Sequence, residues 1–303
     1  MTYRFEGLSE TNEDRWQEQV VRHLGLPDWE VARPGSDLEV IGPAAASLLR
    51  RDGVRWPPNR HFVLLVARMA AGGSVLTGVD GDGLFDRWRW RHAMDVLSRR
   101  RPPTGRDILS AALALSPRPV RAAILGRRSG LALPWLLDGA ARRVHGRQIE
   151  EWAGEPRRWD RRLRWYASRR YVAMFRENAR SLGGLAGATA VPLFLDPGFL
   201  DAVGREGGRT GFGDRTRAMG QLFGDLLPEP VLARSSKAEF TRVFWGEACA
   251  EFARTWTGEG VDHDLVDAAV LARTWKEGPG ATALGATGLL LQSAWLTSHA
   301  ARR

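Results

Sequence analysis

Two carboxylates, Asp80 and Asp82, lie in a glycine-rich turn that directly follows an apolar segment, in the stretch SVLTGVDGDGLF. The apolar part, Ser74 to Thr77, is expected to be a strand. Ligands of parallel α/β sheets bind beyond the carboxyl ends of the strands. Glycines let the backbone approach a phosphate closely, and an aspartate can bind Mg²⁺. The turn therefore predicts a site for the phosphates of ATP, whereas the alternative from the same residues is a solvent-exposed loop in which the aspartates cap backbone groups.

The elements that would position this turn alternate between short strands and helices over residues 1–90, which is typical of a parallel sheet with crossover helices. The expected strands are Tyr3 to Gly7, Trp29 to Arg33 and Ser74 to Thr77, and the expected helices are Glu13 to Leu24, Pro43 to Arg51 and Arg60 to Ala71, the last capped by Asn59. From Asp86 to Arg303 the pattern is almost wholly helical. We therefore expect an α/β fold with a nucleotide-binding part over residues 1–90 and a helical part over residues 91–303, which need not fold independently.

The turn also resembles the second signature of the asparagine synthetase family of ATP pyrophosphatases, L-S-G-E-G-x-D-E-L-F. The matching positions are Leu76, Thr77, Gly78, Gly81, Asp82, Leu84 and Phe85. Four other segments resemble the family in its own order, and they are residues 13–31, 62–73, 191–203 (VPLFLDPGFLDAV) and 226–240 (LLPEPVLARSSKAEF). The resemblance extends from Thr2 to Gly246 and departs from the signature at Val79, Asp80 and Gly83.

This resemblance implies an adenine nucleotide alpha hydrolase-like fold and a site for ATP and Mg²⁺. Asp82 would bind the Mg²⁺ that bridges the phosphates, with Asp80 as a second candidate ligand; the alternative for Asp82 is to cap a helix that begins near Gly83. Thr77, Gly78 and Gly81 would contact ATP, and Phe5 would lie near the adenine unless it is an ordinary core residue. Lys237, in the K-x-x-F segment, would neutralise charge on the pyrophosphate, or else it is an exposed lysine.

The implied reaction is an amide-forming ligation in which ATP activates a carboxylate as an acyl-adenylate, with release of AMP and pyrophosphate. Family asparagine synthetases place Glu at the position of Val79, and valine cannot accept a proton from an attacking amine. Relatives within this superfamily close β-lactam rings or the macrolactam of lasso peptides, with an amine of the same molecule as the nucleophile. The substrate would thus be a small-molecule or peptide carboxylate.

The family's pyrophosphate loop, S-G-G-x-D-S, is absent from the sequence, as is its glutamine-hydrolysing domain. In the sheet order that the resemblance implies, the missing first strand lies in the interior, so its loss would leave unpaired backbone groups on both neighbours. We expect that the start codon lies further upstream, that a partner chain supplies the strand, the loop or ammonia, or that the sheet is rearranged. A non-catalytic homologue that acts as a scaffold is the alternative.

Composition sets the remaining limits. The chain has 303 residues with 44% hydrophobic and 26% charged residues, which is typical of a globular protein. The lone cysteine, Cys249, cannot form an intrachain disulfide, and no secretion signal is recognised. The apolar run from Ala281 to Leu296 is too short to span a bilayer. No spacing of the histidines is typical of a zinc site. We expect a cytoplasmic protein without a membrane partner.

The formal net charge is +9, and all but two of the 44 basic residues are arginine. Arginine clusters can bind nucleic acid, which leaves a nucleic-acid binder as a further alternative. The densest cluster, Arg157 to Arg180, contains an apolar stripe at helical spacing, formed by Trp159, Leu163, Ala167, Tyr171 and Met174. We therefore expect its arginines to cover the solvent-exposed face of a helix.

Overall fold

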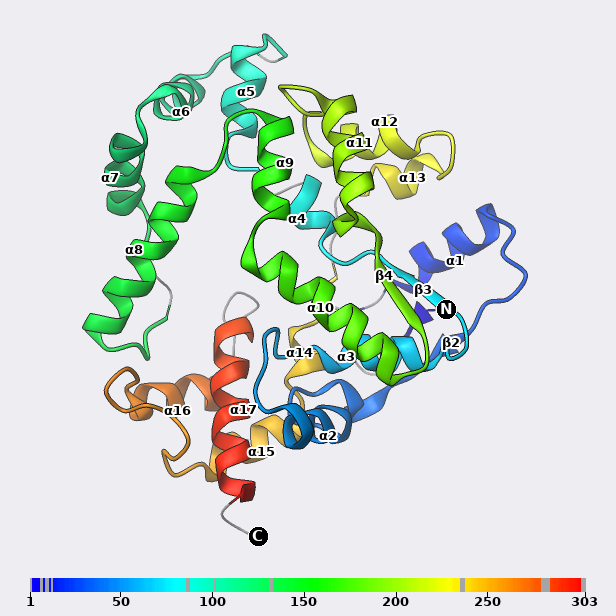
Figure 1. Ribbon diagram of the computed structural model, residues 1–303, viewed down its shortest axis with the longest axis vertical. Helices are drawn as coiled ribbons and strands as arrows, with labels where there is room; N and C mark the ends of the chain where they lie inside the picture. Colours follow the sequence, from blue (N-terminus) through cyan, green and yellow to red (C-terminus); the bar gives the residue numbers. More distant parts are fainter. Residues whose placement is uncertain are drawn as a thin grey trace. The chain divides into compact units, whose positions relative to one another are not determined.

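The computed structural model describes residues 2–5, 8, 11, 13–85, 88–100, 102–130, 133–234, 238–278 and 284–300 (Figure 1). These residues are mostly helical and include short parallel strands, which confirms the expected mixed α/β character. The chain divides into two compact units: unit 1 is Met1–Met69, Ala132–Ala141 and Leu226–Arg303, and unit 2 is Ala70–Leu131 and Arg142–Asp225. The first division therefore precedes the candidate turn, instead of following it near Asp86.

Unit 1 contains β1 (Thr2–Tyr3), α1 (Asp14–His23), β2 (Val31–Ala32), η2 (Gly35–Leu38), α2 (Pro43–Asp52), α3 (His61–Arg68), α13 (Glu229–Leu232), α14 (Thr241–Phe244), α15 (Glu247–Thr255), α16 (Ala268–Glu277) and α17 (Leu284–Ala300). Strands β1 and β2 pair in parallel. Helix α3 begins after Arg60, so the expected cap by Asn59 is wrong. The physical reason is that the helical backbone begins one residue later than expected: Arg60 is the N-cap residue and makes no side-chain cap, and Asn59 lies in the preceding turn.

The core of unit 1 surrounds α17, which is apolar over most of its circumference. Trp135, Trp275 and Leu291 are almost fully buried there. One buried polar side chain ties α17 to its neighbours, because the Gln292 amide donates to the Val40 and Pro58 carbonyls, 2.7 Å from each. In the described part of the chain, no helix is both long and apolar enough to cross a membrane.

Unit 2 contains β3 (Ser74–Thr77), α4 (Gly81–Phe85), α5 (Arg91–Leu97), α6 (Gly105–Leu115), α7 (Arg118–Arg128), most of α8 (Asp138–Gly154), α9 (Trp159–Ala167), α10 (Arg170–Leu185), β4 (Thr189–Pro192), η3 (Leu193–Leu195), α11 (Pro197–Gly207) and α12 (Arg215–Phe223). Strands β3 and β4 pair in parallel, with Leu76 opposite Val191. Among the described residues the strands form two separate two-stranded sheets, so the expected single sheet is not formed by them.

The arginine-rich stretch forms two helices, α9 and α10, instead of one continuous surface helix. Trp159 and Leu163 of the predicted stripe are buried in the core of unit 2, as expected. One arginine contradicts the expectation, because Arg162 is only 2% exposed. Its burial is stabilised by a carboxylate and two backbone carbonyls next to the candidate turn, so the charge remains fully paired.

Candidate functional site

The candidate turn joins β3 to α4 and has the shape that its glycines and Asp80 permit. β3 is a run of strand-forming residues that ends at Gly78, where the chain leaves the sheet. Asp80 then adopts a left-handed backbone conformation, with φ of 71°. Aspartate tolerates this region better than most residues because its short side chain can hydrogen-bond locally. Asp82 follows in the first turn of α4 and is half-buried.

Helix α9 holds the turn from one side through Tyr166. Tyr166 is 3% exposed, and its hydroxyl donates a hydrogen bond to Oδ2 of Asp80. Gly83 lies beside this pair, and a Cβ there would collide with both the Tyr166 hydroxyl and the Asp80 carboxylate. The departure from the family signature at Gly83 therefore has a local cause: only glycine leaves room for the contact between Asp80 and Tyr166.

The same helix fixes α4 through a buried ion pair. Arg162 donates from Nε to Oε1 of Glu155 at 3.0 Å, and from its other two nitrogens to the carbonyls of Leu84 at 2.8 Å and Gly83 at 2.7 Å. Burial raises the pKa of Glu155, while Arg162 and the nearby Arg89 oppose that shift. The carbonyls in the last turn of a helix have no partner within the helix, and here the Arg162 guanidinium of α9 supplies donors to two carbonyls of the short helix α4.

The segment after β4 lies against the other side of the turn. The ring of Phe194 is so close to Gly81 that a Cβ there would lie 3.0 Å from Phe194 Cε2. Two residues later Asp196 caps α11 by accepting a hydrogen bond from the Phe199 amide at 2.9 Å. Because β3 and β4 are parallel, the turn after β3 and the segment after β4 both begin at the same edge of the sheet. Ligands of parallel sheets bind at this edge.

A buried hydroxyl without a partner marks the start of the turn. Thr77 Oγ1 is shielded from solvent and has no hydrogen-bond partner among the described residues. Buried polar groups normally have a partner, so this hydroxyl keeps an unused hydrogen-bonding capacity beside the turn, as does that of Thr287 in the core of unit 1. No three His, Cys, Asp or Glu side chains of the described residues are grouped so that they could hold a metal ion by themselves.

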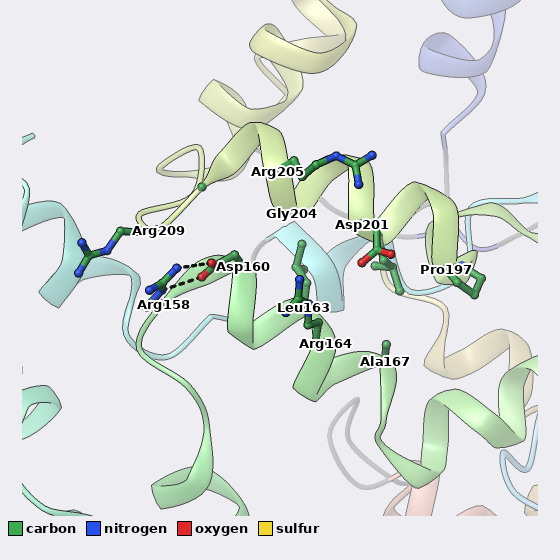
Figure 2. A pocket seen from close by; sticks show the side chains of 12 residues that line it. Arg158, Asp160, Leu163, Arg164, Ala167, Pro197, Asp201, Gly204, Arg205 and Arg209 are labelled. Carbon is green, nitrogen blue, oxygen red and sulfur yellow. Dashed lines mark hydrogen bonds and ion pairs between the residues drawn. The ribbon is translucent and has the colours of Figure 1, made fainter.

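A groove of about 410 Å³ lies between α9 and α11, the two helices that flank the turn (Figure 2). Its lining includes the apolar residues Leu163, Ala167 and Leu200 as well as four arginines, which are Arg158, Arg164, Arg205 and Arg209. Arg158 pairs with Asp160 at 2.5 Å. The other three guanidinium groups are exposed and have no ion-pair partner in the described part of the chain, so the groove carries a net positive charge.

Five of the predicted site residues lie together because they are close neighbours in the sequence. Thr77, Gly78, Asp80, Gly81 and Asp82 are contiguous in unit 2, around the turn. Phe5 belongs to unit 1, where its ring packs 5.8 Å from that of Phe240, which fits the alternative of an ordinary core residue. Lys237 lies outside the described residues.

Sequence reasoning missed three side chains that shape the turn: Tyr166, Arg162 and Phe194. Arg162 and Tyr166 lie on α9, whose arginines were expected to cover a solvent-exposed face. Phe194 lies within the segment that resembles the family, but nothing in its spacing indicates a contact with Gly81. A signal for Tyr166 was present in the helical stripe, since it lies three residues after Leu163 on the same buried face.

All three tyrosines of the chain should resist ionisation in the folded state. Burial raises the pKa of Tyr3, raises that of Tyr171 to about 12, and, together with the Asp80 charge, raises that of Tyr166. A raised pKa stabilises the fold below the unfolded value of about 10, and this stabilisation is lost as pH rises toward the folded value. An alkaline titration followed by phenolate absorbance should therefore show later ionisation in buffer than in urea. Superimposable curves would contradict the burial of these groups.

No protein-family model, curated protein or solved structure matches this chain. The likeness to the asparagine synthetase family, and the roles that it implies, therefore stay predictions based on the residues and their arrangement.

Proposed function

We propose that the protein is an ATP-dependent, amide-forming ligase of asparagine synthetase type. A carboxylate oxygen of the substrate would attack the α-phosphorus of ATP, and the bond to pyrophosphate would break. An amine would then attack the acyl carbon and displace AMP. The observation that supports this proposal best is the Thr77 hydroxyl, buried without a partner at the carboxyl end of a parallel strand, immediately before a turn with two carboxylates.

The residues around the turn fit a magnesium ion that is shared with phosphates. Mg²⁺ is usually held by one or two protein carboxylates together with substrate phosphates and water, so a cage of three protein ligands is not needed. Oδ2 of Asp80 already accepts the Tyr166 hydroxyl. Asp82 is the principal candidate ligand because it matches the aspartate of the signature that the turn resembles, and the contact between Asp80 and Tyr166 would keep the turn in position before ATP binds.

The groove between α9 and α11 suits the substrate carboxylate. Arg164, Arg205 and Arg209 offer guanidinium groups that can bind carboxylates in a bidentate manner. Helix α9, which lines the groove, carries Tyr166, and α11, which lines its other side, directly follows the segment of Phe194. The groove and the turn are therefore formed by the same two parts of the chain. A peptide or small molecule with an acidic group would be retained by charge, with its apolar part over Leu163.

Thr77→Val separates a ligand-binding role from a structural one. The substitution removes a buried hydroxyl that has no protein partner, so stability should be unchanged or should rise by about 1 kcal/mol. Affinity for MgATP should fall by about tenfold, because a hydrogen bond to the ligand is lost. Calorimetric titration with MgATP, and with Ser74→Ala as the control on the same strand, measures this effect. Unchanged ATP affinity together with reduced stability would contradict the proposal.

A split or non-catalytic homologue is the second candidate, because S-G-G-x-D-S is absent from the sequence. In the described residues β3 pairs only with β4, and Leu76 in its centre is 68% exposed. Two-stranded parallel sheets are rare because parallel strands are normally buried on both faces. A partner chain that supplies a strand with the pyrophosphate loop would complete both the sheet and the site. Binding of MgATP by the chain alone would favour the first candidate.

A further inference from the structure

Helix α6 exposes three large apolar side chains to solvent. Ile108, Leu109 and Leu115 are 57%, 62% and 57% exposed, while Ala111 and Ala114 of the same helix are buried in the core of unit 2, on the side opposite Leu109. Leu109 and Leu113, four residues apart, lie on one side of the helix, whereas Ile108 and Leu115, seven residues apart, lie together on another side. Exposed apolar side chains gathered on one element mark interaction surfaces in soluble proteins.

A groove of about 630 Å³ lies on the side of α6 that carries Leu109. Leu109 also lines the groove, together with Trp90, Leu113 and Leu125. Trp90 is 2% exposed, and Leu125 is 8% exposed, so the floor is firmly packed. The concave floor with the exposed Leu109 beside it suits a rod-shaped apolar partner better than a flat lipid surface.

The rim of the groove is strongly basic. Residues 102–130 contain five arginines and one acidic residue, Asp107. Asp107 is buried, and its carboxylate is used in the capping box of α6 with Thr104. Arg106 and Arg128 line the groove, and their guanidinium groups have no hydrogen-bond or ion-pair partner among the described residues. Two copies of such a face would repel each other, whereas an acidic partner would be attracted.

We propose that α6 and α7 form a docking site for an acidic amphipathic helix of a partner protein, with Leu109 at its centre. The apolar side chains of the partner would cover Leu109, Leu113 and Leu125, and its carboxylates would pair with Arg106 and Arg128. This site is separate from the candidate turn and does not depend on the proposed ligase activity.

The test uses a fluorescent synthetic peptide of about 18 residues, long enough to form a helix, with leucines on one face and glutamates elsewhere. The full chain should raise its anisotropy, and Leu109→Ser or the double variant Arg106→Glu/Arg128→Glu should weaken binding by about tenfold or more. A peptide with the same composition in scrambled order, and one with lysine in place of glutamate, should bind more weakly. Leu226→Ser and Arg273→Glu are matched controls at exposed positions outside both grooves, and should bind like the unchanged chain.

Three results would overturn the proposal. The first is peptide binding that does not respond to the Leu109 and arginine variants while circular dichroism shows that these variants are folded. The second is a dimer in sedimentation experiments that Leu109→Ser dissociates, since the face would then bind a second copy. The third is binding to vesicles of phosphatidylcholine and phosphatidylserine that depends on Leu109, since the face would then bind a membrane.

Discussion

Asp82→Asn should abolish magnesium-dependent binding of ATP. The amide removes the negative charge that Mg²⁺ requires while keeping the size of the side chain, so α4 should remain folded. In the presence of a carboxylate substrate, exchange of labelled pyrophosphate into ATP should fall by about 100-fold or more, since charge stabilisation at phosphates is a large part of such catalysis. Calorimetry with MgATP and an exchange assay over a panel of amino-acid and peptide carboxylates measure the two effects.

Lys237→Ala should reduce the same exchange by a similar factor while leaving ATP binding largely intact, because the charge on pyrophosphate develops only during adenylation. The chain offers a precise control, since its only other lysine is Lys276, an exposed residue of α16. Glu206→Gln, at an exposed position of α11, is the control for Asp82→Asn. If both site variants keep the exchange rate of these controls, the assignment of the site is wrong.

Arg162→Met should destabilise the protein by about 3–5 kcal/mol, because it leaves the buried carboxylate of Glu155 without its main partner. The carbonyls of Gly83 and Leu84 also lose their donors. The free energy of unfolding in urea measures this effect. Since burial alone raises the pKa of Glu155, protonation should neutralise it in the variant, so the deficit should shrink as pH falls.

The neighbouring residue provides the control for this substitution. Arg161 is exposed, and Arg161→Met should change stability by no more than about 0.5 kcal/mol. Adding Glu155→Leu to Arg162→Met should recover part of the loss, because the uncompensated charge is removed. A loss below about 1 kcal/mol for Arg162→Met would show that the pair is not buried as described.

Local sequence patterns predicted β3, α1 and α2 closely, whereas the expected strands Tyr3 to Gly7 and Trp29 to Arg33 correspond to the shorter β1 and β2. β3 occupies Ser74 to Thr77 as expected, because a strand-forming run is bounded by glycines on both sides. Helices α1 and α2 agree with expectation to within about two residues, since apolar periodicity and a glycine after each helix are local signals. The cap of α3 was wrong, because a turn that includes Asn59 precedes the helix and places Arg60 at the N-cap, and this depends on backbone geometry rather than on residue type.

The sequence by itself determined that an apolar strand enters a glycine-rich turn with two carboxylates, and that most of the chain is helical. Only the tertiary structure decided what surrounds that turn. Tyr166 lies 86 residues beyond Asp80. The arginines of its helix, α9, predicted a solvent-exposed face, but Arg162 and Tyr166 of this helix are buried next to α4 and the turn. Residues that far apart leave no mutual pattern in one sequence. Their contact depends on how separate helices bury their apolar faces, which is settled by the whole core rather than by any segment.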